Sequence, residues 1–303
     1  MTFTTVIKNE ITKEPSSKVE DLISLNTYLK FNSIITDSKI EIIIENASVA
    51  RWIFKLIKSN YDASVVLTTR TIKRFKIRNL YILSIKDKLD VIASDIENMF
   101  KTIKDSSREE KGAFLKGLFL ACGSINDPKK NQYHLEFLIK AEDVSYYVNK
   151  ILLSLNFKSK VLKRDKEYML YIKASENISD FIKYLGAINA LFYFEDIRIY
   201  KDHKNTVNRL NNCEQANAEK SYHSSITVLD NIKYAEEQDL LILFDERAKE
   251  IIEYKKKYPE TSLLELAEII SIETGKSITK SGINHHFRKL NELVIKQKNH
   301  ALE

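Results

Sequence analysis

The sequence predicts an α+β protein in which a helix–strand–helix–strand–strand–helix unit occurs twice and is followed by an all-α domain. Apolar patterns of helical and strand period recur in the same order, with an offset of roughly ninety residues. From about Leu240 onward the apolar period is helical only. Internal duplication organises a fold strongly, and the alternative is a chance alternation of helices and strands in an undivided α+β chain.

The first repeat is expected over about residues 19–103. A helix is predicted from Val19 to Phe31, because apolar side chains recur there at helical spacing. After a polar break, the β-branched run from Ile40 to Ile44 indicates a strand. Asn46 is suited to cap the next helix, which is expected to end near Lys58. Two strands follow, over residues 64–69 and 80–85, and residues 71–79 form the basic connection between them. A helix over residues 87–103 closes the repeat.

The second repeat is expected over about residues 109–200. Its first helix, Gly112 to Cys122, ends before a turn at Asn126-Asp127-Pro128. A strand is predicted from Tyr133 to Ile139 and a helix from Asp143 to Leu155. A hairpin follows, with strands over residues 159–164 and 168–173. Two short helices, over residues 178–185 and 188–194, complete this repeat.

Three helices are predicted in the C-terminal domain, the first from Asp245 to Tyr258. Ser262 and Glu265 have the spacing of a capping box at the start of the second helix. The link that follows this helix is longer than the usual three- to four-residue turn. Thr279 is suited to cap the third helix. The inward stripe of the third helix is formed by Ile283, Phe287 and Leu290.

The opposite face of the third helix is polar and basic. Its side chains are Lys280, Ser281, Asn284, His285, Arg288 and Lys289. Asn and Arg can bond base edges bidentately, whereas Lys and Ser usually hold phosphates. Between Gly275 and Lys298 there are six Lys or Arg residues and one acid, Glu292. We therefore predict a helix-turn-helix over Ser262 to Ile295 that binds double-stranded DNA. The alternative is a solvated face on a small helical bundle.

The composition is that of an ordinary globular chain, with 44% hydrophobic and 30% charged residues and a mildly basic net charge of +6. The two cysteines, Cys122 and Cys213, exclude a disulfide framework and a metal site built from cysteine alone. No apolar run approaches the roughly 20 residues that span a bilayer. The first residues lack the apolar segment of a signal peptide. We therefore expect a cytoplasmic protein with no membrane partner.

The segment from Leu115 to Ser124, LKGLFLACGS, resembles the LAGLIDADG motif of homing endonucleases. Gly117 and Ala121 lie four residues apart, so their helix face allows close approach of a second helix, expected around Thr27 and Phe31. The resemblance implies a duplicated saddle-shaped sheet domain.

The acid positions of the LAGLIDADG motif are occupied by Asn32 in the first copy and by Cys122 in the second. A neutral carbonyl and a soft sulfur are poor ligands for the hard divalent ions that cut DNA. We therefore predict no catalytic residue, no metal and no cofactor.

Other motifs follow in order along the chain, at residues 186–191 (GAINAL), 207–210 (VNRL), 212–214 (NCE) and 280–285 (KSGINH). Together they resemble the WhiA family of regulators in Gram-positive bacteria over essentially the whole chain. The resemblance implies a degenerate homing-endonuclease domain joined to a helix-turn-helix similar to region four of sigma factors. It also implies a nucleoid-associated, sequence-specific transcriptional regulator of cell division and chromosome segregation, and of sporulation in some relatives. RNA polymerase or a co-regulator protein is implied as a further partner.

Basic residues crowd the two predicted hairpins. They are Arg70, Lys73, Arg74, Lys76 and Arg78 in the first hairpin, and Lys163 and Arg164 with neighbouring lysines in the second. On one groove they would neutralise DNA phosphates without reading sequence. The alternatives are a surface that docks a protein partner and plain solvated hairpin tips.

We therefore expect a LAGLIDADG-like domain over residues 1–200, a polar connector over residues 201–238 and the helix-turn-helix domain over residues 239–303. The favoured function is a DNA-binding regulator that is not an enzyme. Two alternatives remain: a protein-interaction scaffold with a vestigial DNA-binding surface, and a metal-dependent LAGLIDADG nuclease.

Overall fold

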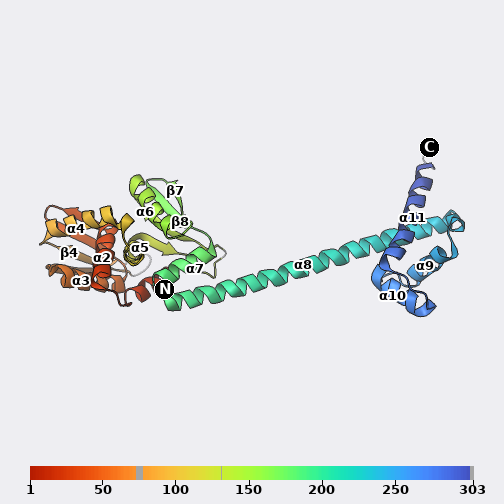
Figure 1. Ribbon diagram of the computed structural model, residues 1–303, viewed down its shortest axis with the longest axis horizontal. Helices are drawn as coiled ribbons and strands as arrows, with labels where there is room; N and C mark the ends of the chain where they lie inside the picture. Colours follow the sequence, from red (N-terminus) through yellow and green to blue (C-terminus); the bar gives the residue numbers. More distant parts are fainter. Residues whose placement is uncertain (73–77, 131, 301–303) are drawn as a thin grey trace. The chain divides into compact units, whose positions relative to one another are not determined.

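The computed structural model describes residues 1–72, 78–130 and 132–300. The chain divides into an N-terminal unit, Met1–Asp202, and a C-terminal unit, His203–Glu303. Helix α8 (Ile188–Glu237) begins in the first unit and ends in the second. Figure 1 shows the elements of both units along the chain.

The N-terminal unit contains two repeats of the order helix, two strands, helix, two strands, helix. The first consists of α2 (Lys18–Asn32), β1 (Ser33–Thr36), β2 (Lys39–Ile44), α3 (Ala47–Tyr61), β3 (Val65–Ile72), β4 (Arg78–Ile85) and α4 (Leu89–Thr102). The second consists of α5 (Arg108–Cys122), β5 (Gly123–Ile125), β6 (Leu135–Ile139), α6 (Glu142–Ser154), β7 (Lys160–Arg164), β8 (Glu167–Ile172) and α7 (Ser175–Tyr184). A short 3-10 turn, η1 (Ile103–Asp105), joins them. The predicted duplicated α+β fold is confirmed.

Each repeat has one strand more than the sequence predicted. These strands, β1 and β5, have four and three residues and directly follow α2 and α5. Strands this short carry no alternation of their own that could be recognised in the sequence. They extend each sheet at one edge, giving the equivalent orders β1-β2-β4-β3 and β5-β6-β8-β7.

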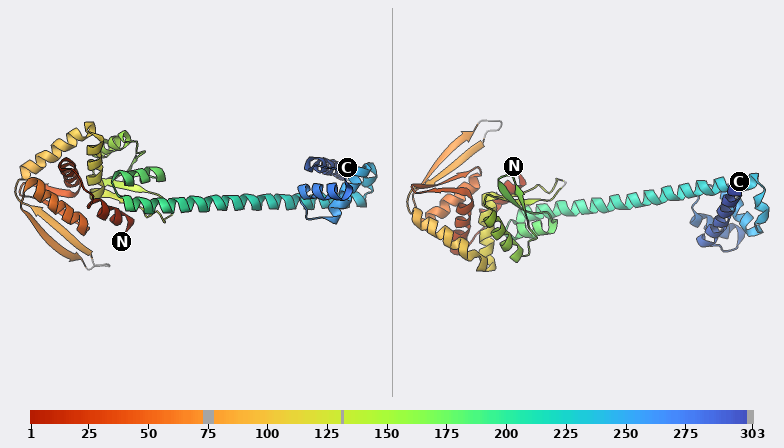
Figure 2. Two further views of the ribbon diagram at one scale, coloured as in Figure 1. Left: turned by 60° about the horizontal axis from the view of Figure 1, so that its bottom comes forward. Right: turned by 90° about the horizontal axis from the view of Figure 1, so that it is seen from above.

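One face of each sheet packs against the hydrophobic core of the N-terminal unit. The antiparallel register pairs Ile42 with Leu83 in the first sheet and Phe137 with Leu170 in the second, and all four side chains are fully buried. Because successive strand residues point to opposite faces, these pairs identify the face that packs against helices. In Figure 2 the hairpin of β3 and β4 extends beyond the helices of its repeat.

The central helices α2 and α5 begin with the same device. Ser17 and Ser107 each accept a hydrogen bond from the backbone three residues later, and Glu20 and Glu110 each accept one from the capping backbone N–H. A capping box of this kind satisfies two donors that a helix start leaves free, and the cap alone contributes about 1 kcal/mol. The repeated box gives the two helices equivalent starting points in their repeats.

An additional helix, α1 (Phe3–Ile11), precedes the first repeat, where the sequence analysis predicted none. Phe3, Ile7 and Ile11 are spaced four residues apart and are all buried in the core of the N-terminal unit. Thr2 caps this helix by accepting from the Thr5 N–H. The apolar spacing and the cap were visible in the sequence but were not recognised.

The C-terminal unit is helical in its described residues, with η2 (Leu240–Leu243), α9 (Glu246–Lys257), α10 (Leu263–Thr274) and α11 (Lys280–His300) following α8. The expected polar connector, residues 201–238, is helical as far as Glu237. Helix α8 contains neither Gly nor Pro to interrupt it. Its Ile232 and Ala235 are buried in the core of this unit, so the all-α core begins before residue 239.

Within residues 1–72, 78–130 and 132–300, no helix is both long enough and apolar enough to span a membrane.

Candidate nucleic-acid interface

Helices α2 and α5 approach each other through Gly117. A Cβ atom added at Gly117 would lie 2.3 Å from the backbone oxygen of Ser24 and 2.8 Å from the Cβ of Thr27. The Ser24 hydroxyl donates to the carbonyl of Ala113 across the same contact, at 2.9 Å. The LAGLIDADG-like segment therefore packs two helices almost backbone to backbone, as its small residues predict.

The ends of this helix pair carry no carboxylate. Asn32, the last residue of α2, donates from Nδ2 to the Tyr28 hydroxyl at 2.7 Å and to the Ile43 carbonyl at 3.4 Å. Cys122, the last residue of α5, donates from Sγ to the Leu118 carbonyl at 3.5 Å. Burial raises the pKa of the Cys122 thiol to about 12, so this group stays protonated at neutral pH. Both side chains are therefore engaged in hydrogen bonds to other groups of the protein.

A lysine from α1 lies beside the end of α5. Lys8 Nζ donates to the Leu120 carbonyl at 3.0 Å. Burial lowers the pKa of this ammonium to about 8, with a smaller opposing effect from Cys122. At neutral pH the lysine remains charged, and a positive charge there repels a divalent cation. Within the described parts of the chain, no three or more His, Cys, Asp and Glu side chains are grouped to hold a metal ion.

Lys8 was not among the predicted site residues. It is separated from Leu120 by 112 positions. Recognising α1 as a helix was the one signal in the sequence that would have drawn attention to it.

The face of the first sheet that points away from the helices has exposed apolar residues at its centre, and its Lys39 and Glu41 form an ion pair with each other. The register places Ile34 beside Glu41, and Ile43 beside Ile82, on the face opposite to Ile42 and Leu83. Ile34 is 60% exposed and Ile43 45%. A surface that binds DNA phosphates needs cations, and the centre of this face does not carry them.

Arg70 is exposed and pairs in register with Leu80, on the same side of the sheet as Ile43 and Ile82. The backbone of Arg78 pairs with that of Ile72. The other predicted contacts of this hairpin, Lys73, Arg74 and Lys76, lie outside the described residues.

The second hairpin separates two predicted contacts. Lys163 pairs with Tyr168, which in turn pairs with the buried Ile139, so Lys163 lies on the core-facing side of the sheet. Arg164 pairs with Glu167. Because neighbours in a strand point to opposite faces, Lys163 and Arg164 do not share one DNA-facing surface. The register thus supports a common surface for Arg164 and Lys160, which are four residues apart and therefore point to the same face.

The helix-turn-helix elements lie in α10 and α11. Ser262 and Glu265 form the expected capping box at the start of α10, and Thr279 accepts from the Gly282 N–H at the start of α11. The inward residues Ile283, Phe287 and Leu290 are all buried. The side chains predicted to meet DNA are all exposed: Lys280, Ser281, Asn284, His285, Arg288 and Lys289.

Most of these side chains are free to meet a ligand. Arg288 lies 3.6 Å from Glu292 in an exposed ion pair, which contributes at most about 1 kcal/mol. His285 packs its ring edge-on against that of His286. Adjacent residues on a helix point about 100° apart, so the two histidines do not form a joint metal site.

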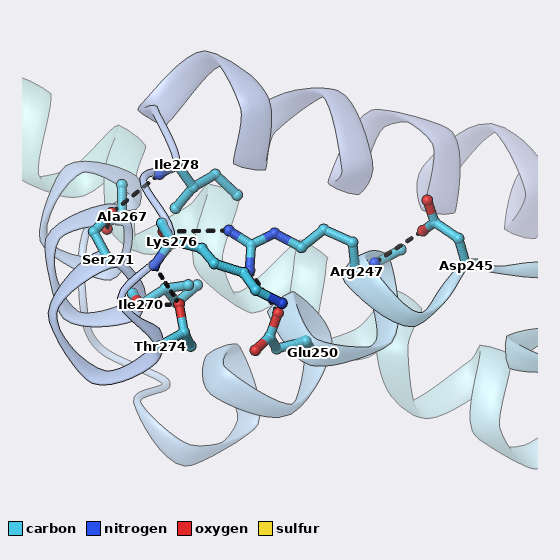
Figure 3. A network of polar contacts seen from close by, with 10 residues as sticks. Asp245, Arg247, Glu250, Ala267, Ile270, Ser271, Thr274, Lys276 and Ile278 are labelled. Atoms are coloured by element: carbon cyan, nitrogen blue, oxygen red, sulfur yellow. Dashed lines mark hydrogen bonds and ion pairs between the residues drawn. The ribbon is translucent and has the colours of Figure 1, made fainter.

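The long link between α10 and α11 is held by a network of polar contacts (Figure 3). Gly275 ends α10 with a φ of 67°, in the left-handed region that favours glycine. The Ile278 N–H then donates to the Ser271 hydroxyl at 3.1 Å, and the Lys276 N–H to Thr274 Oγ1 at 3.3 Å. Arg247 of α9 reaches the Lys276 carbonyl at 3.5 Å. These bonds define the link and with it the start of α11.

Three models of one protein family together match nearly the whole chain. The WhiA N-terminal LAGLIDADG-like domain matches residues 20–97, the WhiA LAGLIDADG-like domain residues 111–204, and the WhiA C-terminal HTH domain residues 207–294. A protein of Bacillus cereus (strain G9842), called probable cell division protein WhiA, is 35% identical over 98% of this chain and 97% of its own length. The chain belongs to the WhiA family. Its relative of the same name in Bacillus mycoides (strain KBAB4) is equally similar, with the same identity and coverage.

Solved WhiA structures share the fold. Full-length DUF199/WhiA from Thermatoga maritima superposes with a TM-score of 0.59 at 22% identity, over 98% of this chain and 99% of that one. The isolated N-terminal LAGLIDADG domain of DUF199/WhiA superposes with a TM-score of 0.51 at 23% identity, over 61% of this chain and 92% of that one. The WhiA family resemblance seen in the sequence is therefore confirmed, together with its LAGLIDADG-like and helix-turn-helix parts.

Proposed function

We propose that this WhiA-family protein is a sequence-specific DNA-binding regulator of transcription that acts in cell division and chromosome segregation. The observation that carries the proposal is the exposed face of α11. Over its first three turns this face combines Asn284 and Arg288, which can bond base edges, with Lys280 and Lys289, which can hold phosphates. The role in cell division is taken from the relatives, which are named probable cell division proteins, and chromosome segregation is what the family resemblance of the sequence implies. Such a role places the protein on the nucleoid, in the cytoplasm.

Crosslinking the protein to DNA across the genome in living cells tests this proposal. We expect discrete enriched sites that share one sequence motif, because base contacts from a single recognition helix select a short sequence. A flat distribution, no different from that of a neutral control protein, would contradict sequence-specific binding.

The proposal includes the absence of nuclease activity. Cys122 is a protonated thiol, Asn32 is a neutral amide and the ammonium of Lys8 lies nearby, so none supplies the charged oxygen ligands that magnesium prefers. We expect supercoiled plasmid DNA to stay intact when incubated with the purified protein and Mg²⁺ or Mn²⁺. Metal-dependent nicking that EDTA abolishes would show that a nuclease function survives.

A scaffold that docks a protein is the second candidate for the N-terminal unit. It is favoured by the apolar, exposed centre of the first sheet, where Ile34, Ile43 and Val66 share one face. RNA polymerase or a co-regulator protein is the partner that this candidate proposes. A gel-shift assay in which the full chain binds DNA no better than a neutral control protein would favour the scaffold over the regulator.

A further inference from the structure

A pocket of about 410 Å³ lies in the C-terminal unit, between α8, α10 and the start of α11. Three lysines from three helices line it: Lys220 of α8, Lys255 of α9 and Lys280 of α11. Hydroxyl groups line it too, including those of Ser221 and Ser224. No Asp or Glu among the described residues is part of its lining. The pocket is therefore a concentration of positive charge and hydrogen-bond donors.

Lys255 is the most unusual of these residues. It is only 1% exposed, and its Nζ donates to the carbonyls of Pro259 at 2.9 Å and Thr261 at 2.8 Å. An ammonium group has three N–H donors, so one remains after these two bonds. Within the described chain Lys255 forms no ion pair. Glu265, whose carboxylate acts on it through space, accepts a hydrogen bond from the Ser262 N–H at 2.8 Å. A buried cation without a paired anion is unfavourable, and an anion in the pocket would compensate it.

Several donors around the pocket have no partner in the described part of the protein, whereas the hydroxyls of Ser225 and Thr261 donate to the carbonyls of Pro259 and Tyr258. Lys220 and Lys280 form neither hydrogen bonds nor ion pairs there, and Ser224 is exposed with a free hydroxyl. Leu263 and Leu264, in the first turn of α10, also line the pocket, and their backbone N–H groups have no acceptor among the described residues. The positive end of the α10 dipole adds to the charge of the three lysines. These are the features of a site for a phosphate group.

We propose that this pocket holds a phosphate of the DNA backbone, so that α8 extends the DNA-binding surface beyond the helix-turn-helix. The inference rests on the proposed function and specifies its geometry. Lys280 belongs to the predicted recognition face of α11 and also lines the pocket. A duplex that contacts the start of α11 therefore brings its backbone to the pocket. A phosphodiester in this position would interact with Lys220 and Ser224 of α8. These contacts would be additional to those made by the helix-turn-helix.

Lys220→Ala is the variant that tests this site, measured in the full chain by fluorescence anisotropy over a range of salt concentrations. We use two labelled duplexes, one with a site recovered by crosslinking and one with the same bases scrambled. We expect affinity for both duplexes to fall about fivefold at physiological salt, and the slope of log affinity against log salt to flatten by about 0.9. Both effects follow from the loss of one phosphate contact, which carries no sequence information.

Two matched variants make the result specific. Lys220→Arg keeps the positive charge and should retain the salt slope of the original chain. Lys233→Ala removes an exposed lysine from the same helix, outside the pocket, and should leave affinity and slope unchanged. Lys220 and Lys233 are both exposed, so neither substitution disturbs the core.

The inference is overturned if Lys220→Ala keeps the salt slope of the original chain while that chain binds the specific duplex. It is also overturned if calorimetry finds that Lys220→Ala weakens binding of inorganic phosphate alone and leaves DNA affinity unchanged, because the pocket would then serve a small anion. An original chain that binds neither duplex would instead defeat the proposed function, and this inference with it.

Discussion

Gly117→Ala is expected to lower the free energy of unfolding of the N-terminal unit by about 3 kcal/mol or more. The new Cβ would lie 2.3 Å from the Ser24 oxygen, and this atom belongs to backbone that cannot rotate away. Relief requires α2 and α5 to separate. These helices form the centre of the core that both repeats share, so the cost spreads beyond one contact.

The measurement is urea denaturation followed by the fluorescence of Trp52, the single tryptophan of the chain. Trp52 is 8% exposed and belongs to the N-terminal core, so it reports on the unit that the substitution affects. Gly112→Ala on the same helix is the matched control. Its Cβ would meet the Tyr184 ring at an ordinary 3.5 Å, and alanine favours the helix by up to about 1 kcal/mol. Equal unfolding midpoints for the two variants would refute the close packing at Gly117.

The double substitution Asn284→Ala and Arg288→Ala is expected to reduce the preference for the target sequence over random DNA by about 100-fold or more. Each bidentate contact to a base edge contributes about 1–3 kcal/mol of discrimination, so losing two removes most of it. Both side chains are exposed, and the Arg288–Glu292 pair is weak, so the domain should remain folded. Binding to random DNA should fall much less.

Footprinting and competition with unlabelled random duplex measure this preference. Lys289→Ala should lower affinity for both DNAs together, because a phosphate contact does not distinguish sequences. Lys249→Ala, on α9 and outside the helix-turn-helix, should change neither value. An unchanged footprint for the double variant would show that Asn284 and Arg288 do not read the bases.

Local sequence patterns were sufficient to predict most helices and strands of this protein. The capping box at Ser262 and the buried stripe of α11 each involve residues within a few turns of one another. Such features are visible in the sequence because their partners are neighbours along the chain. The missing acids at Asn32 and Cys122 were equally visible, since the motif defines their positions. Helix α1 was missed although its spacing was present.

The features that only the tertiary structure decided depend on partners far apart in the sequence. Strand register separates Lys163 from Arg164, although the two are adjacent in the chain. Lys8 reaches the carbonyl of Leu120 from a helix outside both repeats. The pocket around Lys255 is lined by lysines from three different helices. Taken one helix at a time, two of these are exposed lysines and one is buried, and nothing in the sequence indicates that they meet.

The sequence by itself therefore determined the family, the duplicated fold and the helix-turn-helix, because these follow from local periodicity and motif spacing. Packing decided which charges share a surface and which become buried, because these depend on distances in space that no spacing along the chain specifies.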